Sequence, residues 1–88
     1  MVDFKQEIIK IINSELKKEL DSSVIEVPPD KKLGDYAFPC FILSKELKKS
    51  PVDISKSLST NLKPNEFISK IKPVGPYVNF FVKKDCLK

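Results

Sequence analysis

The sequence contains no arginine, no histidine and no tryptophan, and all 16 basic residues among its 88 positions are lysine. Without histidine, the chain lacks the imidazole that serves as the base in Ser-His-Asp and Cys-His pairs and as a common metal ligand. Without arginine, it lacks the guanidinium fork that binds phosphate or guanine through two hydrogen bonds. Any anion must therefore be bound by lysine ammonium groups, backbone N–H groups or helix N-termini.

Cysteine, glycine and long apolar runs are also scarce. Cys40 and Cys86 are too few and too far apart in the sequence to indicate a disulfide framework or a zinc site. Two glycines cannot form a glycine-rich phosphate loop, and no apolar run approaches the roughly 18 residues of a membrane-spanning helix. The first residues lack the order of a signal peptide. We therefore expect a cytoplasmic domain without metal or cofactor and without a membrane partner.

Hydrophobic residues make up 41% of the sequence and charged residues 32%, which is typical of one small globular domain. The net charge of +4 permits an anionic partner without requiring one. The acidic residues form no pair suited to general acid–base catalysis. Cys40 has apolar neighbours and is predicted to be a small buried residue rather than a nucleophile. No catalytic residue is predicted.

Periodicity predicts helices in three segments of the first two thirds of the chain. Residues 3–20 carry an apolar stripe at three- and four-residue steps, and Asp3 resembles the start of a capping box. Pro39 fits the first turn of a second helix that continues to residue 49. A third helix is expected from Ser50, which is a good N-cap before Pro51, to about residue 62.

Strands are predicted at 24–27, 36–38, 67–72 and 77–82. The β-branched run at 24–27 stops at two prolines, and the last two strands are joined by a turn at 73–76. The element order is α-β(2)-α(2)-β(2), which indicates a two-layer α+β domain with its helices packed on one face of a small sheet.

The last predicted strand has two chemically different faces. Val78, Phe80 and Val82 share one face and suit the helix layer, so Tyr77 and Asn79 should stand on the open face. On the strand before it, Phe67 and Ile71 are assigned to the core side, and Ile68, Lys70 and Lys72 to the open side. An aromatic ring, an amide and lysines are the groups with which sheet surfaces bind RNA. The open alternative is that Tyr77 packs at a sheet edge and Asn79 is simply an outward polar residue.

Three motifs resemble one known family in the same order. They are Leu33-Gly34-Asp35-Tyr36-Ala37, Ser50-Pro51-Val52-Asp53-Ile54 and Val74-Gly75-Pro76-Tyr77-Val78-Asn79-Phe80-Phe81. The order is that of the N-terminal additional domain of arginyl-tRNA synthetases, and the resemblance covers residues 1–83, with residues 84–88 as the start of a linker to a catalytic domain that is absent here.

The resemblance implies a tRNA-binding domain that contacts the D-loop through Tyr77 and Asn79. The alternation along residues 67–72 adds Lys70 and Lys72 beside them. Some family members carry an amide just before the Gly-Pro pair; here the position holds Val74, so the resemblance implies no third side-chain contact with the base. The resemblance also implies that ATP and arginine are bound by the catalytic domain in cis, which would be an arginine–tRNA ligase, and that DNA is not a partner. The alternative is a protein-interaction or scaffold domain that docks through its open sheet face without contacting RNA.

Overall fold

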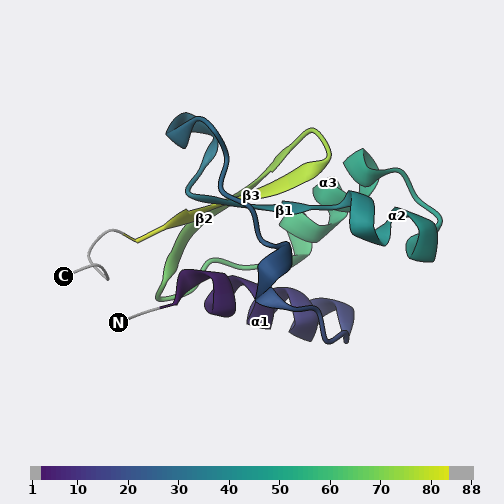
Figure 1. Ribbon diagram of the computed structural model, residues 1–88, viewed down its shortest axis with the longest axis horizontal. Coiled ribbons are helices and arrows are strands. Elements are labelled where there is room, and N and C mark those ends of the chain that lie inside the picture. The colour runs from purple at the N-terminus through teal and green to yellow at the C-terminus, as the bar shows by residue number, and fades with distance from the viewer. Residues whose placement is uncertain (1–2, 84–88) are drawn as a thin grey trace.

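The computed structural model describes residues 3–83. Within this range three helices accompany one antiparallel sheet with the strand order β1-β3-β2. In chain order the elements are α1 (Phe4–Leu16), the 3₁₀ turns η1 (Ser22–Val24) and η2 (Lys31–Leu33), β1 (Tyr36–Pro39), α2 (Phe41–Leu47), α3 (Pro51–Asn61), β2 (Ile68–Val74) and β3 (Tyr77–Val82). Figure 1 shows α1 on one side of the sheet and the loop that carries η2 on the other. The predicted α+β class is confirmed.

The starts of α1 and α3 agree with the sequence prediction, whereas the end of α1 and the start of α2 differ from it. Asp3 caps α1 by accepting a hydrogen bond from the backbone N–H of Gln6 at 3.2 Å, and Ser50 caps α3 in the same way. Helix α1 ends at Leu16 rather than near residue 20, because Lys17 takes a left-handed conformation and the Asn13 side chain binds the backbone of Leu20. Pro39 is the last residue of β1 and does not open the second helix.

The strand predicted at 24–27 is wrong. Val24 ends the turn η1, and only Glu26 pairs with β1, in a single bridge to Ala37. Pro28 follows within two residues and has no N–H to donate, so pairing cannot continue along this segment. The sheet therefore has three strands instead of the expected four.

The core lies between the helices and one face of the sheet. Its members come from every regular helix and strand: Phe4, Ile8, Ile9, Ile12, Ile25, Phe38, Cys40, Leu43, Ile54, Leu58, Leu62, Ile68, Val78, Phe80 and Val82. Ile68 was assigned to the open side, and that assignment is wrong. A register shift between Ile68 and Lys70 places Ile68 opposite Val82 in the core and Lys70 opposite Phe81 on the other face.

Candidate nucleic-acid interface

Tyr77 begins β3, the central strand, and lies on the face of the sheet that the helices leave open. Its neighbours across the ladders are Pro39 of β1 and Val74 of β2, so both sides of its backbone are paired. The ring is half-buried, and its contact with Phe41 is edge-to-face, with centroids 5.7 Å apart and planes at 85°. Tyr77 is therefore held at the sheet surface while part of its ring stays accessible.

Asn79 does not stand free on this face as expected, because only 2% of it is exposed. Its Nδ2 donates a hydrogen bond to the backbone carbonyl of Leu33 at 2.5 Å. Its Oδ1 is buried and accepts no hydrogen bond. A buried amide oxygen without a partner is unfavourable by itself. The amide is thus fixed in one orientation, with one donor bonded to the Leu33 carbonyl and an acceptor oxygen without a partner.

The loop before β1 causes this burial. Gly34 lies against β3 with φ at +137°, and a Cβ at this position would come within 3.2 Å of both the Asn79 Cβ and the Phe80 carbonyl oxygen. Asp35 then donates its N–H to the Phe80 carbonyl at 2.9 Å and accepts the Val82 N–H on Oδ2 at 3.0 Å. Asp35 thus ties the loop to β3 through its backbone and its side chain. Glycine is needed at position 34 because the two backbones approach so closely.

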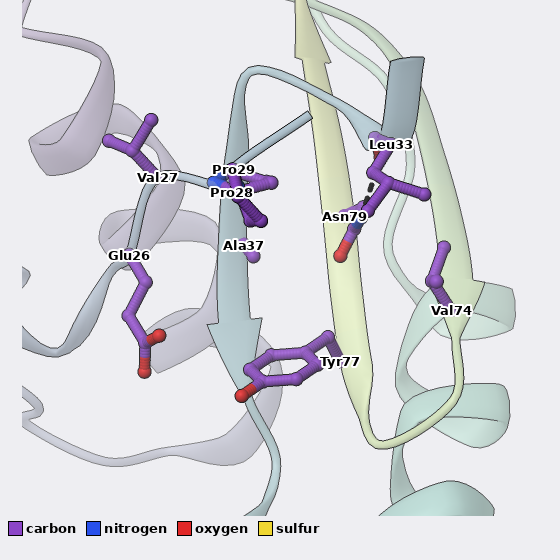
Figure 2. Close-up of a pocket in the computed structure, with 9 residues that line it drawn as sticks. All are labelled: Glu26, Val27, Pro28, Pro29, Leu33, Ala37, Val74, Tyr77 and Asn79. Atoms are coloured by element: carbon purple, nitrogen blue, oxygen red, sulfur yellow. Dashed lines mark hydrogen bonds between the residues drawn. The ribbon is translucent and has the colours of Figure 1, made fainter. Parts of the chain in front are cut away.

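A pocket of about 350 Å³ opens beside Tyr77 and Asn79 on this face. Its walls are mostly apolar, and its lining residues are Glu26, Val27, Pro28, Pro29, Leu33, Ala37, Val74, Tyr77 and Asn79. Figure 2 shows that they come from the loop before β1 and from all three strands, with the Asn79 oxygen facing the pocket. Sequence periodicity missed Glu26 and the two prolines, because the segment was interpreted as a strand. The two consecutive prolines were the sequence feature that could have indicated a rigid pocket wall at this place.

Lys70 and Lys72 lie on the same face and are exposed, as predicted. Lys72 pairs with Asn79 across the ladder, and the Nζ atom of Lys70 lies 5.5 Å from the centroid of the Phe81 ring, in cation–π geometry. Neither lysine lines the pocket. The four predicted residues therefore share one surface, with Tyr77 and Asn79 at the pocket and the lysines beside it.

Metal binding, membrane crossing and thiol chemistry can each be compared with the described residues. Between residues 3 and 83, no cluster of three or more metal-ligating side chains occurs, and no helix is long and apolar enough to cross a membrane. Cys40 is fully buried, and burial raises the pKa of its thiol from 9.0 to about 12. Its thiolate is therefore suppressed at neutral pH, as expected for a core residue. Cys86 lies outside the described residues.

The fold and the pocket define a small two-layer α+β domain with helices on one sheet face and a ligand-sized pocket on the other. The family model described as the arginyl tRNA synthetase N terminal domain matches residues 2–82. The chain belongs to this family, and the resemblance drawn from the three motifs is confirmed.

Similar proteins agree with the family assignment. The arginine–tRNA ligase of Clostridium kluyveri is 48% identical over 89 residues, which cover 94% of this chain and 15% of that protein. The arginine–tRNA ligase of Clostridioides difficile is 44% identical over 90 residues, which cover 99% of this chain and 16% of that protein. Among solved structures, Thermus thermophilus arginyl-tRNA synthetase matches with a TM-score of 0.81 and 32% identity, covering 97% of this chain and 15% of the matched chain. The chain thus spans about one sixth of the length of these relatives.

Proposed function

We propose that this chain is the tRNA-binding N-terminal domain of an arginine–tRNA ligase, and that it contacts the D-loop of tRNA through the pocket beside Tyr77. A catalytic domain in cis would attach arginine to the tRNA with ATP, and residues 84–88 would begin the linker to it. We place the whole protein in the cytoplasm. The observation that carries the proposal is the unpartnered, buried Oδ1 of Asn79 at a pocket next to an accessible aromatic ring. A nucleobase would stack on the ring and donate a hydrogen bond to the amide.

The lysines beside the pocket would bind phosphates. Lys70 and Lys72 are exposed on the pocket face, and without arginine each supplies a point charge rather than a bidentate contact. Such contacts position the RNA but do not read its sequence. We therefore expect weak binding that depends on salt, with a dissociation constant on the order of 10⁻⁴–10⁻⁶ M.

The test is binding of labelled tRNA to this chain, measured by fluorescence anisotropy over a series of salt concentrations. Tyr77→Ala should weaken binding about tenfold or more through loss of stacking, whereas Tyr77→Phe should retain most of it. Lys72→Ala should reduce the salt slope, and Lys56→Ala, an exposed lysine of α3, is the matched control. Wild-type affinity in Tyr77→Ala would refute the role of the pocket.

The second candidate function is docking of another protein domain on the open face. It is favoured by two exposed apolar residues at the start of α2, the helix whose Phe41 contacts the Tyr77 ring: Phe41 is 52% exposed and Ile42 is 46% exposed. An apolar docking surface would lose little affinity with added salt, whereas binding through lysines weakens steeply. A chain that binds no tRNA at low salt would favour docking.

A further inference from the structure

Among the described side chains that line the pocket, Asn79 and Glu26 present hydrogen-bond acceptors. Asn79 donates one N–H of its amide to the Leu33 carbonyl, and its Oδ1 is left as an acceptor without a partner. Glu26 adds a carboxylate, which accepts but does not donate when ionised. Among the described lining residues the third polar side chain is Tyr77, and its hydroxyl can serve in either role. A ligand that carries N–H donors therefore complements the acceptors of this pocket.

Glu26 is held at the pocket by its backbone and not by its side chain. Its N–H donates to the Ala37 carbonyl at 2.8 Å, and the Ala37 N–H donates to the Glu26 carbonyl at 2.7 Å. Val27 and the prolines after it continue along the pocket wall. Among residues 3–83 the Glu26 carboxylate has no hydrogen bond or ion pair. In Figure 2 the Tyr77 hydroxyl points toward the side of the pocket on which Glu26 lies, and Asn79 is on the opposite side of β1.

A carboxylate at this place has a clear electrostatic consequence for an RNA site. It repels phosphates and so weakens binding of any RNA that offers nothing to the carboxylate. A base that donates an N–H to it gains a charge-assisted hydrogen bond, which offsets the repulsion. Glu26 would thus lower affinity in general while raising discrimination between bases.

Given the proposed RNA-binding function, on which this step depends, we propose that Glu26 is a specificity-determining residue of the pocket. Its carboxylate accepts an N–H of the bound base and favours bases with an exocyclic amino group over uracil. An amino group brings N–H donors to the edge of the base. Uracil has a single ring N–H between two carbonyl oxygens, and these oxygens would face the acceptors of the pocket.

The experiment uses RNA hairpins of identical stem whose loop contains one variable nucleotide: adenosine, its analogue purine riboside without the amino group, or uridine. Binding to the chain is measured by anisotropy at low salt. The wild-type chain should bind the adenosine hairpin about five- to tenfold more tightly than the other two. Glu26→Gln should reduce this ratio to about twofold or less and should strengthen binding of the uridine hairpin, since the repulsion is removed.

The control is Glu19→Gln, which makes the same charge change at an exposed residue outside the pocket lining. It should change the affinity for all hairpins alike and leave the ratio as in the wild type. If Glu26→Gln also keeps the wild-type ratio, while Tyr77→Ala still abolishes binding, Glu26 does not determine specificity. If no hairpin binds at any salt concentration, the proposed function itself fails, and the role of Glu26 fails with it.

Discussion

The two faces of β3 exclude water by different means. On one face, Val78, Phe80 and Val82 are buried against the helices. On the other face, Asn79 is nearly as buried, but a loop covers it, and the cover leaves a pocket with a polar group unsatisfied. Helix packing fills space and contributes stability, since apolar side chains interdigitate. The loop leaves room for a ligand and fixes the orientation of the Asn79 amide. Substitutions on the two faces should therefore have different effects on stability and on binding.

Adjacent phenylalanines give the largest expected difference between the faces. Phe80 is fully buried in the core, whereas its neighbour Phe81 is half-buried on the open face beneath Lys70. Phe80→Ala should cost about 3–5 kcal/mol in the free energy of unfolding, because it leaves a cavity. Phe81→Ala, the matched control, should cost about 1 kcal/mol or less. Urea denaturation followed by circular dichroism measures both; equal losses would mean that the two faces contribute alike to stability.

Asn79→Asp tests whether the loop holds the amide in one orientation. The introduced carboxylate cannot donate to the Leu33 carbonyl while ionised, so we expect a loss of about 1–3 kcal/mol at neutral pH. Burial should raise the pKa of this carboxyl in the folded state, so the folded state holds its proton to higher pH than the unfolded state. The variant should therefore lose stability as the pH rises above about 4.

The control for that substitution is Asn61→Asp at the exposed end of α3. Asn61→Asp should lower the free energy of unfolding by less than about 1 kcal/mol, through the helix dipole. Its stability should not fall with rising pH as that of Asn79→Asp does. Equal losses in the two variants over the whole pH range would show that the contact between Asn79 and Leu33 contributes nothing.

Phe41→Ala should have the smallest effect of these substitutions. It tests whether Phe41 positions the Tyr77 ring for binding without contributing to the stability of the fold. Phe41 contacts the Tyr77 ring edge-to-face but is more than half exposed. Its removal should weaken tRNA binding about two- to fivefold, because the Tyr77 ring becomes less ordered, with little change in unfolding. Ile42→Ala is the control on the same helix with similar exposure. If Ile42→Ala weakened tRNA binding by the same factor, the effect would come from contact between tRNA and α2 and not from the Tyr77 ring.

Much of the core face could be predicted from the sequence because it depends on local rules. Alternation along 77–82 identified Val78, Phe80 and Val82, and the residue types at Asp3 and Ser50 marked two helix starts. The motif around Gly34 and Asp35 supported the family through its residues alone. These signals involve neighbours in the chain and require no knowledge of distant contacts.

The open face depended on contacts that periodicity does not encode. The burial of Asn79 results from Leu33, which lies 46 positions earlier in the chain. The bulge near Ser69 moved Ile68 into the core, since one extra residue reverses the alternation. The segment with Glu26 has strand-like composition but forms only one bridge, because proline ends the pairing. The pocket and its carboxylate could therefore be found only from the three-dimensional structure.

The most direct test of the central claim is a nuclear magnetic resonance titration of the ¹⁵N-labelled chain with tRNA at low salt. If the open face is the RNA interface, the signals of Tyr77, the Asn79 side-chain amide and Val74 should shift or broaden first. Signals from the exposed side of α1 and α3 should stay unchanged at the same tRNA concentration. Perturbations centred on α1 or α3, with the Asn79 amide unmoved, would contradict the account.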